Sequence, residues 1–242
     1  MIDGKSFLAI IPARVGSKGL KKKNLKQLCG KPLVCWSIDA GLKSKYIDEV
    51  MVSTDDHQIA KAAKICGAKV PFIRPEFLAT DSTPTFNVIQ HVVDYYKSEL
   101  KKEFDYIVLL EPTSPMRESI DIDNSIEKLI NSNAHSIVGI SKTESQNPSF
   151  LVLKNSQSYI SGFENPNIEV IRRQNIKNVY FLEGSIYISK TNILLNKKTF
   201  YHDKTLGYEF DKYKSFEIDD IYDFVIIEAL MKYKSRKYDI QK

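Results

Sequence analysis

In the first half of the chain, short continuous apolar runs alternate with segments in which apolar residues recur with the period of a helix. Short apolar runs rich in β-branched residues are typical of buried strands, and three of them stand at 7–13, 48–54 and 104–112. Around them, apolar residues recur every three to four positions, which predicts amphipathic helices over 32–44, 55–68, 83–100 and 119–132. Strands that alternate with helices in this way predict an α/β fold, with a mostly parallel sheet and helices on both faces.

The pattern changes between residues 145 and 183. Asn-Pro pairs and short β-prone runs replace the long helices there, which predicts a small β-rich lobe inserted into the main domain. The earlier pattern resumes with a strand-like run at 185–190 and a final helical pattern at 219–234. We therefore interpret residues 1–242 as a single domain that carries the lobe 145–183 as an insertion.

The composition is that of an ordinary globular protein, with 43% hydrophobic residues, 27% charged residues and a formal net charge of +5. No apolar run approaches the roughly 20 residues of a membrane-spanning helix, and the N-terminus lacks the features of a signal peptide. The three cysteines form no Cys-x-x-Cys pair, so reduced thiols are expected. These features predict a cytoplasmic location.

One segment combines the features of an anion-binding loop. It directly follows the predicted strand 7–13, and in a parallel sheet the loops at the carboxyl ends of the strands hold ligands. Glycine lets backbone N–H groups approach an anion, while arginine and lysine donate charge-assisted hydrogen bonds to phosphate oxygens. The segment supplies these groups through Arg14, Gly16, Ser17, Lys18, Gly19, Lys23 and Asn24. It therefore predicts a cradle for a polyphosphate.

Several other kinds of site fit the sequence less well. Gly16 and Gly19 are too close together for a Walker A loop, and the dinucleotide spacing G-x-G-x-x-G is absent. The four histidines are scattered, so neither a zinc site nor a Ser-His-Asp hydrolase is indicated. Clustered lysines also suggest a nucleic-acid-binding module, but residues 18–26 contain no aromatic side chain on which a base would stack. That module is a distant alternative.

The loop sequence IIPARVGSKGLKKKN resembles the signature of the acylneuraminate cytidylyltransferases, also called CMP-sialic acid synthetases, of the sugar nucleotidyltransferase superfamily. The likeness continues in the expected order through GKPLVCWSIDAG, VMVSTDD, VPFIRPEFLATDSTPT, LLEPTSPMR and GSIYIS. The long first motif is specific, and the whole set covers most of the chain.

This resemblance implies a Rossmann-like α/β domain with a small lobe that mediates dimerisation and leans over the partner's active site. The implied enzyme is a nucleotidyltransferase. The anomeric hydroxyl of a nonulosonic acid (sialic acid, legionaminic acid or a relative) attacks the α-phosphate of CTP and releases pyrophosphate, with Mg²⁺ or another divalent cation as cofactor. A Kdo-type or other sugar-acid cytidylyltransferase is the alternative. The implied partners are CTP, a nine-carbon sugar acid and a second copy in a homodimer, with no nucleic acid or membrane.

The resemblance also assigns a nucleotide site. The residues implied to contact CTP are Arg14, Ser17, Lys18, Lys23, Asn24, Arg74, Asp81 and Ser82. Arg14 and Lys23 are the implied catalytic cations, because fixed positive charges stabilise the pyrophosphate as it leaves. Arg74, Asp81 and Ser82 are implied to bind the nucleotide or to shape its pocket.

The sugar side of the implied site lies in the motif LLEPTSPMR and in the lobe segment VIRRQ. The implied residues are Glu111, Thr113, Ser114, Arg117 and Arg173, with Arg172 as the alternative to Arg173. Glu111 stands where the family usually has glutamine, and a carboxylate there would ligate a metal or accept a hydrogen bond from the sugar. Glu183 stands where the family usually has asparagine, and it is assigned no role.

The metal site is expected in the segment SFEIDDIYDF. Mg²⁺ takes oxygen ligands, and the residues implied to supply them are Asp219, which also counts as catalytic, and Glu217. In an extended stretch, side chains two positions apart project to the same face. Asp220 and Asp223 are expected to cap the final helix, where negative charge meets the positive end of the helix dipole.

Overall fold

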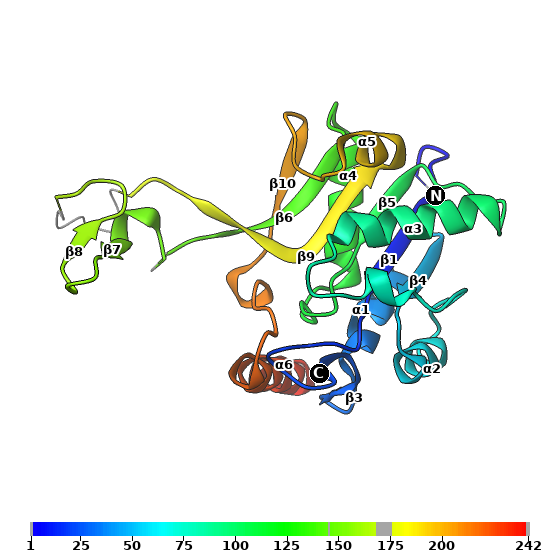
Figure 1. Cartoon of the computed structure of the whole chain (residues 1–242), viewed down its shortest axis with the longest axis horizontal. Coiled ribbons are helices and arrows are strands. Elements are labelled where there is room, and N and C mark those ends of the chain that lie inside the picture. The colour runs from blue at the N-terminus through cyan, green and yellow to red at the C-terminus, as the bar shows by residue number, and fades with distance from the viewer. Residues whose placement is uncertain (1, 145, 168–175, 241–242) are drawn as a thin grey trace.

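A six-stranded sheet forms the centre of the fold (Figure 1). The computed structural model describes residues 2–144, 146–167 and 176–240. From edge to edge the strands are β10 (Thr205–Glu209), β6 (Ser136–Lys142), β9 (Tyr180–Lys190), β5 (Tyr106–Leu109), β1 (Phe7–Pro12) and β4 (Glu49–Ser53). Within this sheet β9 runs antiparallel to β5 and β6, and the other neighbours are parallel. The predicted α/β fold with a mostly parallel sheet is confirmed.

Helices cover both faces of the sheet. One face packs against α1 (Leu33–Leu42), α2 (His57–Ile65) and α4 (Ser119–Ile130), and the other against α3 (Thr85–Ser98) and α5 (Thr191–Lys197). Strand β1 shows the consequence, because Ala9 and Ile11 point into one helical layer while Leu8 and Ile10 point into the other. A strand covered on both faces needs apolar residues at successive positions, which explains the continuous apolar run in the sequence.

Two neighbouring aspartates after β4 have different tasks. Asp56 caps α2, because its carboxylate accepts a hydrogen bond from the backbone N–H of Ile59 at 2.8 Å. Asp55 accepts a hydrogen bond from the backbone N–H of Val15 at 3.0 Å. Asp55 therefore fixes the loop that follows β1 to the end of β4.

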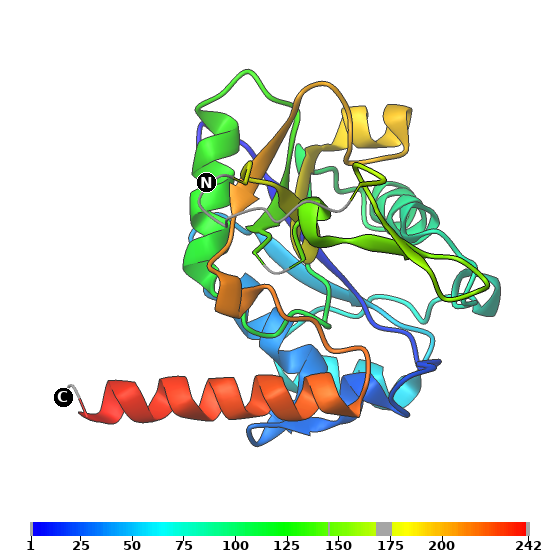
Figure 2. The same ribbon diagram turned by 90° about the vertical axis from the view of Figure 1, so that its left-hand side faces the viewer.

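The last helix, α6 (Ile221–Ile240), lies along one edge of the body, as Figure 2 shows. It packs on the short hairpin of β2 (Gln27–Leu28) and β3 (Lys31–Pro32) and on the start of α1. The shared apolar cluster consists of Leu20, Leu28, Leu33, Met116, Ile218, Phe224 and Ile227. This cluster holds the segment before α6 against the region that follows β1.

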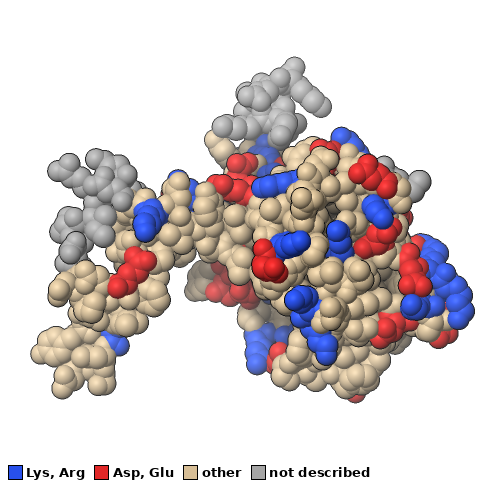
Figure 3. Space-filling view, turned by 90° about the horizontal axis from the view of Figure 1, so that it is seen from above, with Lys and Arg blue, Asp and Glu red and all other residues tan. Residues whose placement is uncertain are grey.

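The chain between β6 and β9 leaves the body as a projecting lobe (Figure 1). It contains a two-stranded sheet of β7 (Val152–Lys154) and β8 (Ile160–Gly162). Its large apolar side chains are 41–57% exposed at Leu151, Val152, Leu153, Ile160 and Phe163. On the face shown in Figure 3 the lobe is mostly uncharged, whereas acidic and basic side chains are interspersed over the body. That the lobe mediates dimerisation stays a prediction.

Two of the three cysteines are joined. Cys35 of α1 and Cys66 at the end of α2 form a disulfide with their Cα atoms 5.8 Å apart, while Cys29 is a free thiol. The prediction of three reduced thiols is therefore wrong for this pair, because sequence spacing does not reveal that α1 and α2 pack side by side. In the part of the chain that the structure describes, no helix has the length and apolar character that crossing a membrane requires.

Candidate active site

The carboxyl ends of β1, β4 and β5 face one region of the molecule, because these neighbouring strands are parallel. The loops that follow β1 and β5 supply most of the predicted residues. Two further segments reach the same region: 183–185 at the beginning of β9, and 217–219 just before α6. The backbone N–H of Ile218 donates to the carbonyl of Thr113 at 2.8 Å, which joins the loop after β5 to the segment before α6.

The cationic loop after β1 binds an internal carboxylate. Asp81 forms ion pairs with Arg14 and with Lys18, whose Nζ lies 2.8 Å from Oδ2 of Asp81. Hydrogen bonds from Lys18 and then Arg14 hold the pKa of Asp81 below its usual value. The carboxylate of Asp81 thus lies between two cations of this loop, and the binding of a phosphate by the same cations stays a prediction. Ser82 lies beside it, exposed, with its hydroxyl 3.3 Å from that of Thr80.

Two residues of the predicted phosphate cradle have different surroundings. Asn24 is buried, and its amide donates to the carbonyl of Arg14 at 2.9 Å, so it braces the loop from within. Ser17 is half-buried in the same loop. The contact of either side chain with a phosphate stays a prediction.

Lys23 links the cationic loop to the acidic segment. Its Nζ donates to the carbonyl of Ile218 at 2.7 Å and lies 3.4 Å from Oδ1 of Asp219. Its side chain is only 14% exposed, whereas that of Asp219 is 83% exposed. A largely buried cation is therefore held beside an accessible carboxylate.

Gly19 permits this close approach. A Cβ atom at Gly19 would lie 2.2 Å from the backbone oxygen of Asp219, a distance that no real contact reaches. The loop after β1 and the segment before α6 are thus in backbone contact at Gly19, and a side chain there would push them apart.

Gly19→Ala is expected to lower turnover at least about tenfold, because a displacement on the order of 1 Å in a preorganised site is costly. The matched control is Val15→Ala in the same loop, because the exposed side chain of Val15 is assigned no role in the site. Circular dichroism would first verify that both variants fold. Initial rates of the catalysed reaction, compared between the two variants, would then test the expected loss of turnover. Equal rates in the two variants would contradict a role for the close approach.

Arg74 is buried beside the end of β4, and its contact with a nucleotide stays a prediction. Its Nε donates to Oγ of Ser53 at 3.1 Å, and its guanidinium also donates to the carbonyls of Ser53 and Leu78. Burial lowers the pKa of Arg74 to about 10. The side chain braces the end of β4 against the short helix η2 (Glu76–Leu78).

Glu111 follows β5, and its backbone is firmly held. Its carbonyl accepts hydrogen bonds from Oγ of Ser37 at 3.1 Å and from both terminal nitrogens of Arg117 at 3.3 Å. Burial, and then the nearby charge of Glu217, raise the pKa of Glu111 to about 7, although Arg117 and Lys23 oppose this shift. The carboxyl of Glu111 therefore titrates near neutral pH.

Arg117 lies beneath Glu111 and is 3% exposed. Its guanidinium also donates to the carbonyl of Ser185 at 2.6 Å and to Oγ of Ser37 at 2.6 Å. Ser114 is buried as well, while Thr113 is half-buried. The structure thus places Arg117 where it positions the loop after β5, and its contact with a sugar stays a prediction. Arg172 and Arg173 lie outside the described residues.

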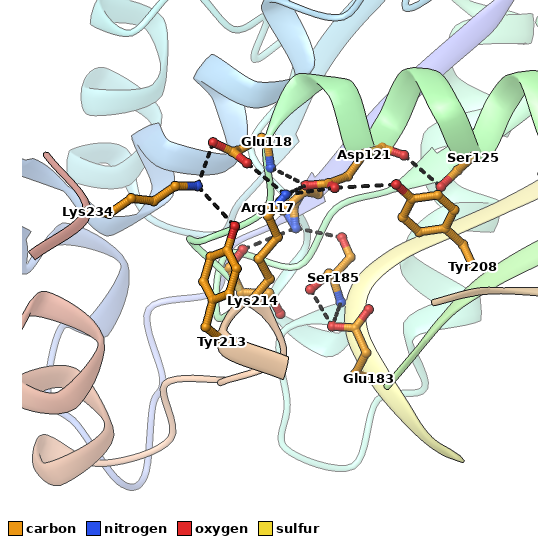
Figure 4. Close-up of polar contacts among 11 residues, drawn as sticks. Arg117, Glu118, Asp121, Ser125, Glu183, Ser185, Tyr208, Tyr213, Lys214 and Lys234 are labelled. Atoms are coloured by element: carbon orange, nitrogen blue, oxygen red, sulfur yellow. Dashed lines mark hydrogen bonds and ion pairs between the residues drawn. The ribbon is translucent and has the colours of Figure 1, made fainter. Parts of the chain in front are cut away.

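Glu183, to which the sequence assigned no role, is a buried part of this framework (Figure 4). Its carboxylate accepts hydrogen bonds from the hydroxyl and the backbone N–H of Ser185, the second at 3.3 Å. Its other oxygen, Oε1, fills the space left by the missing side chain of Gly139 and has no hydrogen-bond partner among the described residues. Burial raises the pKa of Glu183 to about 7.

Glu183→Gln is expected to weaken the pH dependence of stability. Because the pKa of Glu183 in the folded protein lies above that of an ordinary glutamate, its contribution is fully present in acid and is lost as the pH rises through 7. Up to about 3 kcal/mol of the free energy of unfolding should disappear over this range in the parent. Denaturant titrations at pH 5 and pH 8 would measure it, with exposed Glu76→Gln as control. If the free energy of unfolding changes equally between pH 5 and pH 8 in the parent and in Glu183→Gln, Glu183 is not the group that causes the pH dependence.

Glu217 and Asp219 flank Ile218 at the mouth of the site. The carboxylate of Glu217 accepts a hydrogen bond from the backbone N–H of Gly184. Burial, and then the charge of Asp219, raise the pKa of Glu217. The described residues contain no group of three His, Cys, Asp or Glu side chains at metal-binding spacing. Two carboxylates fit Mg²⁺ when a triphosphate and water supply the remaining oxygens.

An ion network anchors the chain just before Glu217 (Figure 4). The buried Nζ of Lys214 lies 2.8 Å from Oδ2 of Asp121 and 2.7 Å from Oε2 of Glu118. Lys234 of α6 binds the same Glu118 at 2.9 Å. These contacts tie α6 and the segment before Glu217 to the first turn of α4. The helix beyond is capped as expected, since Asp220 accepts hydrogen bonds from the N–H groups of Tyr222 and Asp223.

Comparison with known proteins places the chain among nucleotide-transferring enzymes. The family described as "Cytidylyltransferase" matches residues 8–241. CMP-N,N'-diacetyllegionaminic acid synthase of Legionella pneumophila is 37% identical over 229 residues, which cover 93% of this chain and 96% of that protein. N-acylneuraminate cytidylyltransferase of Escherichia coli O18:K1:H7 is 34% identical over 231 residues, which cover 96% of this chain. The match covers 53% of the E. coli protein, so the chain spans about half the length of that relative.

A solved structure supports the fold independently. CMP:2-keto-3-deoxy-manno-octonic acid synthetase, solved in complex with CTP, superposes with a TM-score of 0.68 at 20% identity. The superposition covers 95% of this chain and 99% of that one. At this level of identity the likeness concerns the architecture of the whole chain.

Proposed function

The chain belongs to the cytidylyltransferase family, and from this premise we propose that it joins CMP from CTP to the anomeric hydroxyl of a nonulosonic acid and releases pyrophosphate. The observation that supports this most is the contact between the cationic loop after β1 and the acidic segment before α6. Lys23 and Asp219 meet there, with Nζ and Oδ1 3.4 Å apart. Transfer of a nucleotidyl group needs fixed positive charge for the phosphates and carboxylates for a metal, side by side.

The loop after β1 would bind the triphosphate of CTP. Arg14 and Lys18 already hold the carboxylate of Asp81, and phosphate oxygens would take over these donors. Lys23, held by the carbonyl of Ile218, would stabilise the charge that pyrophosphate gains as it leaves. Because the protein fixes this cation in advance, no reorganisation is needed during the reaction.

Glu217 and Asp219 would hold Mg²⁺ or another divalent cation together with the phosphates. When bound, the cation offsets the repulsion between the triphosphate and the attacking oxygen and favours loss of the hydroxyl proton. The backbone contacts of Ile218 with Lys23 and Thr113 would keep the two carboxylates in place for this task.

The acceptor would lie next to Glu111 and Thr113, beside the segment 217–219. Arg173 of the lobe keeps its predicted role as the group that recognises the sugar carboxylate, because a guanidinium binds a carboxylate in a bidentate manner. We further propose a homodimer in which a second copy covers the exposed apolar side chains of the lobe.

A Kdo-type acceptor is the second candidate. Glu111 favours it, because this chain has a carboxylate where acylneuraminate cytidylyltransferases usually have glutamine. The two candidates share the nucleotide chemistry and differ in the sugar.

Release of pyrophosphate from CTP tests the proposal. We expect release that requires CTP, Mg²⁺ and a nine-carbon acid from a panel of N-acetylneuraminate, legionaminate and pseudaminate. Release with Kdo alone would favour the second candidate. No release with any of the four acids, or release without an acid, would contradict the proposed function.

A further inference from the structure

Building on the proposed function, we propose that the preferred acceptor carries a basic nitrogen substituent, an amine or an amidine, and that Glu111 selects it. The way in which the carboxylate of Glu111 is held and surrounded favours one kind of acceptor within the proposed class.

The position of Glu111 is fixed before any ligand arrives. Its carbonyl accepts three hydrogen bonds, one from Ser37 of α1 and two from Arg117. Arg117 is itself held by the carbonyl of Ser185 in β9. The backbone of Glu111 is therefore tied to α1 directly and to β9 through Arg117, and its side chain emerges from a rigid base, as a specificity-determining residue requires.

The carboxylate of Glu111 accepts no hydrogen bond within the part of the chain that the structure describes. None of the described residues donates a hydrogen bond to it, although the residue is only partly exposed. This differs from the other carboxylates of the site, since Asp81 binds two cations and Glu217 accepts from the N–H of Gly184. A poorly solvated carboxylate without donors gains most from a ligand that supplies them.

The charges around Glu111 favour a cation as that donor. Burial, and then repulsion by Glu217, raise the pKa of Glu111, while the cations that oppose the shift, Arg117 and Lys23, donate to other acceptors, which include the carbonyl of Glu111 itself. An anionic acceptor without compensating charge would add to this repulsion. An amine or amidine on the acceptor would instead bring a positive charge to Glu111 and donate a charge-assisted hydrogen bond to its carboxylate. Such a bond is about twice as strong as a neutral one.

A divalent cation is the less suitable occupant of this position. Among the described residues, Glu111, Glu217 and Asp219 do not form a preassembled group of three metal ligands. An ionised glutamate is also a pure acceptor of hydrogen bonds, whereas glutamine both donates and accepts. A carboxylate in this place therefore distinguishes a nitrogen that only donates from an amide that also presents a carbonyl.

The test compares two acceptors that differ in one group. A nonulosonic acid with a free amine and the same sugar with that amine acetylated are assayed with the parent and with Glu111→Gln. We expect the parent to prefer the amine in kcat/KM by about 10- to 100-fold, the value of one hydrogen bond to a charged group. In Glu111→Gln the preference should vanish, with kcat/KM for the acetylated sugar unchanged or higher.

The control variant is Glu103→Gln, which removes an exposed carboxylate that pairs with Lys97 and should keep the preference of the parent. A parent that prefers the acetylated sugar overturns the inference whatever the variant does. An equal loss with both acceptors in Glu111→Gln overturns it as well. Both results leave the proposed function intact, because each still includes acceptor-dependent release of pyrophosphate from CTP.

Discussion

Lys23→Ala is expected to lower kcat by about two to three orders of magnitude, the usual effect of removing one preorganised charge donor. The Nζ of Lys23 is held at 2.7 Å from the carbonyl of Ile218 and lies beside Asp219, so no other side chain takes its place without rearrangement. Because the cation acts mainly on the departing pyrophosphate, kcat should fall more than the affinity for CTP. Steady-state kinetics together with calorimetric binding of CTP would separate the two effects.

Lys21→Ala is the matched control for this variant. Lys21 belongs to the same run of three lysines but is exposed. It should retain nearly the turnover of the parent. A Lys23→Ala variant that is as active as Lys21→Ala would show that the loop is a solvated basic segment and not a phosphate cradle.

Asp219→Asn should produce a loss of similar size that additional Mg²⁺ partly restores. The substitution keeps the shape of the side chain and removes the charge that a divalent ion needs. The side chain of Asp219 is 83% exposed, so the variant should fold normally and still bind CTP weakly. A Mg²⁺ titration of initial rates should give a midpoint well above that of the parent.

Asp220→Asn provides the comparison for Asp219. Asp220 is adjacent and exposed, and it caps α6 through the N–H groups of Tyr222 and Asp223. Asparagine also caps helices, so this variant should keep both the rate and the Mg²⁺ midpoint of the parent. If Asp219→Asn behaves in the same way, the metal site lies elsewhere.

The position of the loop after β1 could be predicted from the sequence more fully than the way in which the buried arginines are held. The loop after β1 could be recognised because its glycines and cations directly follow a buried apolar run, so position and chemistry are local in the chain. The burial of Arg74 and Arg117 is not local. Each guanidinium is bound by carbonyl groups of other elements, and no periodic pattern in the sequence marks an arginine that braces a loop from below.

Glu183 shows a second limit of the sequence. Its place in the fold depends on Gly139 of β6, where the missing side chain leaves room for a carboxylate oxygen. The two residues meet because the pairing of β6 with β9 is irregular between Val138 and Ile140. Strand β9 itself is antiparallel because the chain returns to the body from the lobe. Such a return cannot be read from apolar periodicity, which does not encode strand direction.

The central claim is that the bond between the α- and β-phosphates of CTP is the one that breaks, with transfer of CMP to the sugar. Phosphorus NMR of the reaction mixture, combined with mass spectrometry of the sugar product, measures this directly. The account predicts a sugar linked to one phosphate and a cytidine, formed in equal amount with pyrophosphate. A sugar linked to CDP with orthophosphate, or free CMP with an unchanged sugar, would contradict it.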